Sequence, residues 1–306
     1  MYRTLWGRAL LLLLPCWLAA CAPEPAPQDV IDVLLIPADG GTEDGTLADY
    51  QPLFAAVEQT SDLTFRLRVA QSYGAVVEAI CNGSADVAFV GPVTYLQARQ
   101  RGCADLLAVA VKGEQSTYHS GIFVRTDSPI RQLADLRGHS LALGDLNSTS
   151  SFVVPVAMLV DGGLDPTRDL SAIRMTGTHS GNLAALAGGH VDAAAMSFES
   201  YQKALRNGFP GARQVRVIAR SEPIPFPPLV MNVRLPAARK QALRQALAGI
   251  AHAPGVVPEM IRGYGGAQVD GYDTTFAASR FDGVARKMAL LDEDLTGAIL
   301  AKAARR

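Results

Sequence analysis

The stretch that most constrains the fold is residues 139–159, which read HSLALGDLNSTSSFVVPVAML. Residues 140–143 are an apolar run of strand length, residues 144–151 are polar, and residues 152–160 are apolar and long enough for a buried helix. A strand, a short polar loop and a helix in this order form the first half of a βαβ unit. The sequence therefore predicts an α/β fold.

Consecutive hydroxyl side chains open that predicted helix: Ser148, Thr149, Ser150 and Ser151. The first turn of a helix has backbone N–H groups without intrahelical partners and a partial positive charge. One or two hydroxyls would be enough for an ordinary cap, so the longer run favours a site for a small tetrahedral oxyanion. The stretch is not a P-loop, because it lacks the glycine spacing and the lysine of that motif.

Composition limits the kind of partner. The chain has 306 residues, of which 49% are hydrophobic and 19% are charged, so it can form two domains with cores of their own. The net charge of -1 provides no basic field for nucleic acid. Because no Cys/His spacing resembles a zinc site, we expect neither a metal nor another cofactor.

The N-terminus is typical of an export signal. Two arginines and an apolar run at 9–20 predict a signal peptide over residues 1–20, followed by a Pro-rich tether at 21–28. The tetrapeptide Leu-Ala-Ala-Cys ending at Cys21 matches the bacterial lipoprotein pattern, and the alternative is a plain signal peptide with a chance cysteine. We expect an exported protein held on the periplasmic side of a membrane through lipidated Cys21; whether that membrane is inner or outer stays open.

Two further cysteines remain in the exported chain. Cys81 ends a predicted helix and Cys103 precedes a predicted strand, so both lie at the amino-terminal edge of the first sheet. Since exported proteins fold in an oxidising compartment, we predict a disulfide between them.

Hydrophobic periodicity predicts alternating strands and helices, and hence doubly wound parallel sheets. Strands are predicted at 30–36, 65–69, 86–90, 105–111, 118–125, 140–143, 172–175, 191–196, 214–219 and 229–233. Helices are predicted at 47–60, 73–82, 93–101, 150–160, 180–187, 199–207, 237–250, 256–262 and 277–300.

A sequence pattern that occurs twice in the chain predicts two similar lobes. Residues 78–89 and 184–195 each contain a helix end, a glycine stop, an aspartate and an apolar strand. We expect one lobe from residues 29–117 plus 229–306 and a second from 118–228. Two crossing segments would join the lobes and leave a cleft that closes by hinge motion.

Ligands of open α/β sheets bind beyond the carboxyl ends of the strands, and this rule selects the candidate residues. The hydroxyl run, His179, Glu199 and Tyr95 all follow predicted strands, whereas Tyr118 lies on a crossing segment. A lone histidine is usually structural, but His179 sits at a helix start on the ligand side. For Tyr95 and Tyr118, a place in the core and a place in the site are equally expected. Asp86 and Asp192 begin their strands, so we interpret them as turn residues at the far edge.

Several segments, in order, resemble the phosphate/phosphite/phosphonate-binding proteins of ABC importers, the phosphonate-binding periplasmic family. They are GSADVAFVGPVTYLQA (83–98), YHSGIFV (118–124), GDLNSTSSFVVP (144–155), GTHSGNLAALAGGHVDAAA (177–195) and IPFPPLV (224–230). The resemblance implies a two-lobed periplasmic binding protein fold of type II, a phosphorus oxyanion as ligand, a permease in the inner membrane as partner, a monomer and no enzymatic activity.

The resemblance also implies roles for individual residues. Ser148, Thr149 and Ser150 with the helix amides would hold the oxyanion, and His179 and Tyr118 would complete its shell. No Lys or Arg lies between Gly138 and Arg168, so these donors would be neutral and binding would depend weakly on ionic strength.

Glu199 occupies a place where relatives that take an aminoalkylphosphonate have an acidic residue for the amine. A second acid is expected near the Pro-rich return, where the nearest is the displaced Glu222. The alternative for Glu199 is an acidic residue that is simply favoured at a helix N-terminus.

Two other functions are compatible with parts of the sequence. A hydrolase could use Ser148 or Ser150 as nucleophile and His179 as base, but the chain has no G-x-S-x-G elbow and no carboxylate clearly placed behind the histidine. A sensor that signals to a membrane partner would use the same fold, and the sequence does not separate it from a transport protein.

Overall fold

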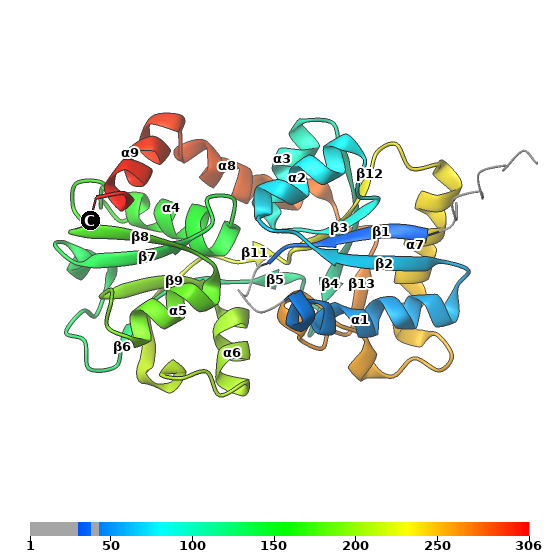
Figure 1. Cartoon of the computed structure of the whole chain (residues 1–306), viewed down its shortest axis with the longest axis horizontal. Helices are drawn as coiled ribbons and strands as arrows, with labels where there is room; N and C mark the ends of the chain where they lie inside the picture. Colours follow the sequence, from blue (N-terminus) through cyan, green and yellow to red (C-terminus); the bar gives the residue numbers. More distant parts are fainter. Residues whose placement is uncertain (1–29, 38–42, 306) are drawn as a thin grey trace, which may run out of the picture.

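The structure, a computed structural model, describes residues 30–37 and 43–305. The predicted signal peptide (1–20) and the whole predicted tether (21–28), which includes Cys21, lie outside these described residues. Two lobes lie side by side, each a β-sheet flanked by helices (Figure 1). This arrangement matches the α/β class and the two lobes that the sequence predicts. Within the described ranges, no helix has both the length and the apolar character needed to cross a membrane.

The first sheet has the order β13-β4-β12-β3-β1-β2. Its strands are β1 (Val30–Leu35), β2 (Thr64–Val69), β3 (Val87–Phe89), β4 (Ala104–Val111), β12 (Pro228–Asn232) and β13 (Gly271–Asp273). Strand β1 is parallel to β2 and β3, whereas β12 runs antiparallel between β3 and β4. The sheet is mixed because β12 enters from the other lobe in the opposite direction.

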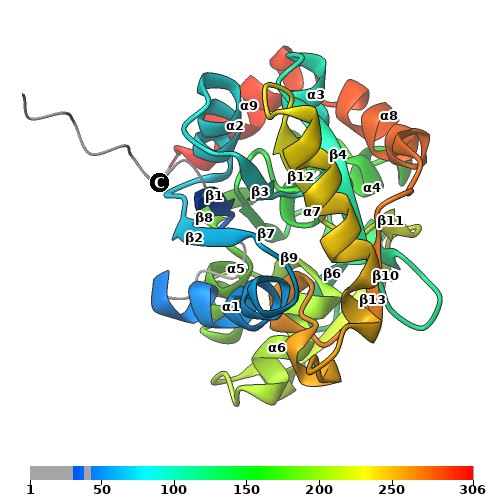
Figure 2. The same ribbon diagram turned by 90° about the vertical axis from the view of Figure 1, so that its right-hand side faces the viewer.

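Helices α1 (Glu43–Thr60), α2 (Tyr73–Asn82), α3 (Pro92–Gln100) and α7 (Ala237–Gly249) flank this sheet (Figure 2). Helix α2 has the predicted bounds, because both of its ends carry local signals. Ser72 Oγ accepts a hydrogen bond from the Ala75 N–H, and Gly83 closes the helix with φ +86°. Cys81, in the last turn of α2, is disulfide-bonded to Cys103, with their Cα atoms 4.8 Å apart.

The second sheet has the order β10-β6-β9-β7-β8 and is also mixed. Its strands are β6 (Ser120–Arg125), β7 (Ser140–Gly144), β8 (Ala172–Gly177), β9 (Ala193–Ser197) and β10 (Val215–Arg220). Strand β7 is parallel to β8 and β9, and β6 is antiparallel to β9 and β10. Helices α4 (Val154–Asp161), α5 (His179–Ala187) and α6 (Phe198–Arg206) flank this sheet.

Asp86 and Asp192, the two aspartates of the repeated sequence pattern, have equivalent places in the two sheets. Asp86 Oδ2 accepts a hydrogen bond from the Asp32 N–H at 3.0 Å. Asp192 Oδ2 accepts one from the Ser140 N–H at 2.8 Å. Each carboxylate thus accepts a hydrogen bond from a backbone N–H of the adjacent parallel strand. Both aspartates lie where their own strands begin. In the second sheet, the hydroxyl run lies at the opposite ends of the strands.

The lobes are joined by two crossing segments and share a core. Strand β5 (Thr117–Tyr118) pairs antiparallel with β11 (Ile224–Pro225) between the sheets. The larger hydrophobic core contains buried residues from both lobes, such as Phe89 and Leu141. A smaller core in the second lobe includes Phe123 and Leu186.

The C-terminal region differs from the sequence prediction. Residues 258–260 form a short 3-10 turn, η5 (Pro258–Met260), where a longer helix was predicted. The single helix predicted at 277–300 is a 3-10 turn, η7 (Ala278–Phe281), followed by α8 (Asp282–Leu290) and α9 (Glu293–Ala303). Asp292 separates the two helices because its Oδ1 caps α9 by accepting from the Leu295 N–H at 2.8 Å.

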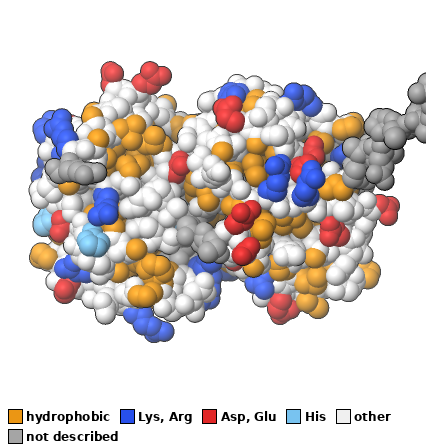
Figure 3. All heavy atoms as spheres, viewed as in Figure 1, with side chains coloured by type: hydrophobic (Ala, Val, Ile, Leu, Met, Phe, Trp, Pro, Cys, Tyr) orange, Lys and Arg blue, Asp and Glu red, His pale blue; other side chains and the backbone are white. Residues whose placement is uncertain are grey.

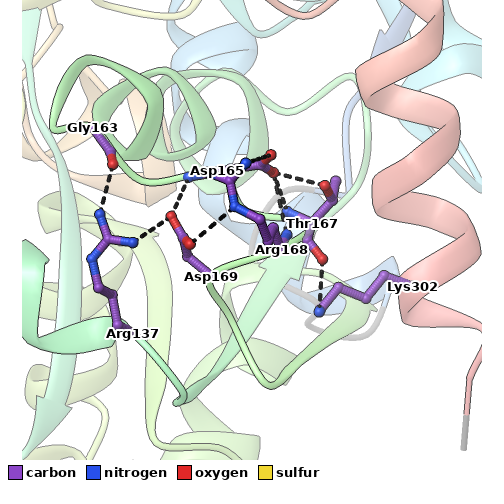
Figure 4. Close-up of polar contacts among 7 residues, drawn as sticks. All are labelled: Arg137, Gly163, Asp165, Thr167, Arg168, Asp169 and Lys302. Atoms are coloured by element: carbon purple, nitrogen blue, oxygen red, sulfur yellow. Dashed lines mark hydrogen bonds and ion pairs between the residues drawn. The ribbon is translucent and has the colours of Figure 1, made fainter.

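Helix α9 belongs by sequence to the segment expected in the first lobe, but it packs against β8 of the second sheet. Lys302 Nζ donates to the Thr167 carbonyl at 2.9 Å (Figure 4). The loop that holds Thr167 is itself ordered by Asp169, whose carboxylate lies 2.7 Å from a guanidinium nitrogen of Arg137. The C-terminus is therefore fixed to the second lobe.

Candidate functional site

The hydroxyl run forms a buried turn between β7 and α4. Residues 148–151 are each 1% or 2% exposed. Ser148 Oγ accepts hydrogen bonds from the backbone N–H of Ser151 at 3.3 Å and from its hydroxyl at 2.7 Å. A Cβ on Gly144 would collide with Ser151 Oγ, so glycine at the end of β7 allows this close approach. The helix opens with a π-turn, η2 (Thr149–Val153), a feature frequent at functional sites.

Thr149 and Ser150 connect this turn to the first lobe and to Tyr118. Thr149 Oγ1 accepts a hydrogen bond from the Val93 N–H, in the first turn of α3, at 2.9 Å. The Tyr118 side chain is completely buried, and this burial raises its pKa above the usual value. The charge of Glu199 acts in the same direction, while hydrogen bonds with Ser150 and Thr149 oppose it. The phenol therefore stays a neutral hydroxyl at physiological pH.

His179 begins α5 and is 2% exposed. The Ser197 N–H donates to His179 Nδ1 at 3.3 Å. Because a backbone amide can only donate, the neutral ring carries its hydrogen on Nε2. That nitrogen lies 3.0 Å from the Tyr264 hydroxyl oxygen, to which it donates. The one N–H donor of the imidazole is therefore directed at Tyr264 of the first lobe.

Tyr264 brings the first lobe into the same cluster. It lies in the 3-10 turn η6 (Tyr264–Gly266) and is 4% exposed. Its hydroxyl lies 3.2 Å from Ser200 Oγ and 3.3 Å from Ser197 Oγ. Its ring meets the edge of Tyr118 with centroids 5.6 Å apart. Residues from both lobes thus converge on one buried polar cluster.

Glu199 lies in the first turn of α6, next to this cluster. One of its carboxylate oxygens is buried, and its charge acts on the Tyr118 hydroxyl. The helix itself is capped by Ser197 Oγ, which accepts from the Ser200 N–H at 3.0 Å. The carboxylate therefore lies on the side of α6 that faces this cluster, a place consistent with an amine partner and with a favourable helix N-terminus.

Tyr95 lies apart from the other predicted site residues. It is 1% exposed and meets the edge of the Phe281 ring, with centroids 5.0 Å apart. The preceding residue, Thr94, faces the site turn and donates to the Asn147 carbonyl at 3.4 Å. Since a helix turns by about 100° per residue, Tyr95 points away toward the C-terminal segment.

Sequence reasoning missed several members of the cluster. Ser197 ends strand β9, and Ser200 follows that strand as Glu199 does, so the strand-end rule could have selected both serines. Ser120 Oγ donates to the Ser150 carbonyl at 2.7 Å, although Ser120 lies inside a predicted strand. Tyr264 had no signal of its own, because only the folding of a distant Gly-rich turn brings it to His179.

The chemistry of this cluster suits an oxyanion better than a metal. The partners described for the hydroxyl run are other hydroxyls, backbone groups and a phenol. Among the residues that the structure describes, no group of three or more His, Cys, Asp or Glu side chains could hold a metal ion. Acidic and basic side chains are interspersed over the visible face of both lobes (Figure 3).

Comparison with solved structures places the fold among periplasmic binding proteins of type II. A binding protein component of an ABC phosphonate transporter from Pseudomonas aeruginosa superposes with a TM-score of 0.76 at 21% identity, covering 91% of this chain and 90% of that one. PhnD1 from Prochlorococcus marinus, solved with methylphosphonate, superposes with a TM-score of 0.72 at 15% identity, covering 85% and 98%.

Comparison with protein families is more specific. Residues 41–276 match the family described as "ABC transporter, phosphonate, periplasmic substrate-binding protein", and the chain belongs to this family. The Phosphate-import protein PhnD of Mycolicibacterium smegmatis is 30% identical over 57% of this chain and 60% of its own length. The Phosphonates-binding periplasmic protein of Escherichia coli is 27% identical over 61% of this chain and 56% of its own length. The matches thus span a little over half of these relatives.

Proposed function

We propose that this protein binds a phosphorus oxyanion between its lobes and delivers it to an ABC permease in the inner membrane. The observation that carries the proposal is the convergence of Ser150, Tyr118, His179 and Tyr264, which come from both lobes, on one buried polar cluster. Membership of the family supports a substrate-binding role and a periplasmic location.

The oxyanion is bound by neutral donors. The hydroxyls of Ser148, Thr149 and Ser150, the first amides of the π-turn and the Tyr118 phenol can each donate to a phosphoryl oxygen, and the His179 Nε2–H can turn from Tyr264 to the ligand to do so. Ser148 also shapes the turn, since its Oγ accepts from Ser151 and keeps its own hydrogen for the ligand. Hydrogen bonds to a charged acceptor are stronger than those between neutral groups, so a closed, dry cleft holds the anion without lysine or arginine.

The ligand is phosphonate, phosphite or phosphate, and Glu199 separates these choices. A carboxylate beside the oxyanion repels it unless a cation lies between them. An aminoalkylphosphonate supplies that cation through its ammonium group, whereas phosphate and methylphosphonate do not.

The mature protein is a monomeric carrier that is tethered to the membrane through lipidated Cys21 and the segment 21–28. Its role is stoichiometric binding and not turnover. A hydrolase would release product from a phosphonate or a phosphate ester. A sensor would bind the same ligands, and its gene would neighbour a kinase and not a permease.

Calorimetric titration with phosphate, phosphite, methylphosphonate and 2-aminoethylphosphonate tests the proposal. We expect one site per chain that is filled by at least one of these ligands, and no product after incubation with phosphonates or phosphate esters. Turnover of any of these compounds would show that the protein is an enzyme and not a carrier. Absence of binding to the whole panel would refute the oxyanion site.

A further inference from the structure

An ion pair joins the two lobes outside the candidate oxyanion site. Lys203, on α6 of the second lobe, donates through Nζ to Asp49 Oδ2, on α1 of the first lobe. The two side chains are 21% and 20% exposed, respectively. The pair is thus partly shielded from water, where salt weakens an attraction less than it does at an open surface.

The same aspartate also supports the turn that carries Tyr264. A Cβ on Gly266 would overlap Asp49 Oδ1, and Gly266 has φ +67°, so the carboxylate packs closely on the backbone of this turn. The neighbouring Tyr50 hydroxyl accepts a hydrogen bond from the Gly265 N–H at 3.4 Å. Helix α1 therefore holds the η6 turn at the place where Tyr264 reaches His179.

On the other lobe, Lys203 lies on the same helix as two residues of the polar cluster. Glu199 precedes it by four positions and Ser200 by three, so all three lie on one side of α6. A cavity of about 370 Å³ between α5 and α6 is lined by Lys203, Ser200 and His179, among others. The ion pair thus lies at the edge of the cluster and joins α6 of the second lobe to α1 of the first.

We propose that Asp49 and Lys203 are a positioning pair that favours the closed arrangement of the lobes and thereby sets ligand affinity. When only the closed form binds tightly, the apparent affinity falls in proportion to the closed fraction of the ligand-free protein. The pair acts through Tyr264 and His179, whose contact requires the same approach of α1 to α6. An ion pair within one lobe, such as Arg101 with Glu78 between α3 and α2, has no such effect because opening the cleft leaves it intact.

The test combines neutralising, exchanged and control variants. Lys203→Met and Asp49→Asn each remove the attraction, the double variant Asp49→Lys/Lys203→Asp restores it with reversed sign, and Arg101→Gln removes the more exposed Arg101–Glu78 pair within one lobe. Two quantities are measured: the radius of gyration of the ligand-free protein by small-angle X-ray scattering, and the dissociation constant for methylphosphonate by calorimetry. The first does not depend on the proposed ligand.

We expect each single variant to enlarge the ligand-free radius of gyration and to weaken methylphosphonate binding by about threefold to tenfold, the range of a modest shift in closed population. The exchanged variant should recover part of both losses, and Arg101→Gln should match wild type.

Unchanged radii of gyration in both single variants would overturn the proposal, as would an exchanged variant no better than the single ones. If wild type fails to bind any oxyanion of the panel, the proposed function fails. The scattering comparison still decides whether the ion pair holds the lobes together.

Discussion

His179 Nε2 lies 3.0 Å from the hydroxyl oxygen of Tyr264, and this hydrogen bond joins α5 of one lobe to the η6 turn of the other. The Ser197 N–H at Nδ1 fixes the ring tautomer, so Nε2–H is the donor. The donor that we assign to the ligand is thus shared with a residue that reaches it only when the lobes are together. Binding and closure are therefore coupled through one imidazole.

Tyr264→Phe tests this coupling. The variant keeps the ring contact with Tyr118 but removes the hydroxyl at His179 and Ser200. We expect methylphosphonate affinity to fall by about tenfold, because the loss of one buried hydrogen bond costs about 1–3 kcal/mol. Tyr272→Phe is a matched control, since its buried hydroxyl donates to the Arg262 carbonyl within the first lobe. It should lower thermal stability similarly and leave the dissociation constant unchanged.

Ser150→Ala tests the hydroxyl run. The hydroxyl of Ser150 is buried and hydrogen-bonded with Tyr118, at the place assigned to the oxyanion. Its loss should weaken oxyanion binding by about 1–3 kcal/mol, the range for hydrogen bonds to charged groups. Ser84→Ala removes an exposed hydroxyl of the first lobe and should have no effect. If Ser150→Ala and Ser84→Ala bind the oxyanion with equal affinity by calorimetry, Ser150 is not part of the binding site.

Glu199→Gln tests whether the natural ligand carries an amine. If the carboxylate meets an ammonium group, the variant should bind 2-aminoethylphosphonate more weakly and methylphosphonate equally or more tightly, because the repulsion of the oxyanion is gone. Both dissociation constants are measured on the same preparation. If neither changes, Glu199 is only a favourable helix-start residue, and the cargo is phosphate, phosphite or a simple phosphonate.

The disulfide between Cys81 and Cys103 can be tested by thiol labelling of denatured, unreduced protein that lacks the lipidation site. We expect no reactive thiol before reduction and two afterwards. The Cys81→Ser/Cys103→Ser variant should lose about 3 kcal/mol of unfolding free energy, since a closed loop of this size restricts the unfolded chain. Two reactive thiols before reduction would contradict the bond.

Acid sensitivity should depend on Asp192. Burial raises the pKa of this carboxyl, but hydrogen bonds from the Ser140 N–H and hydroxyl, together with the nearby His139, outweigh burial and lower it. A lowered pKa contributes stability above the unfolded-state pKa of about 4, and that stability is lost as the pH falls through the folded-state pKa. Asp192→Asn should therefore destabilise the protein at neutral pH, and the difference from wild type should shrink in acid.

Urea unfolding of wild type and Asp192→Asn across this pH range measures the effect. A difference between the two proteins that does not change with pH would show that the carboxylate charge has no part in holding β7 to β9.

The fold followed from local signals wherever those signals were complete. Helix α2 has a serine cap and a glycine stop, and its predicted bounds match. The interpretation of Asp86 and Asp192 as far-edge residues rested on strand polarity alone and agrees with their contacts. The antiparallel direction of β6 and β12 could not be predicted from local sequence signals, because it depends on how the chain crosses between the lobes.

The candidate site was only partly predictable for the same reason. The strand-end rule selected His179 and Glu199, which lie at helix starts next to the buried polar cluster. It left Tyr95 equally expected in the core and in the site, and the structure places it in the core, since one residue along a helix changes the direction of a side chain by about 100°. It could not select Tyr264, whose position depends on the packing of α1 against a turn more than 200 residues later in the chain.

A crystal structure of the protein with its tightest-binding oxyanion from the panel tests the central claim most directly. The proposed site predicts phosphoryl oxygens within hydrogen-bonding distance of the Ser150 hydroxyl, the Tyr118 phenol and the His179 Nε2–H, with both lobes in contact with the ligand. A ligand bound to one lobe only, or at a place that these side chains do not reach, would contradict it.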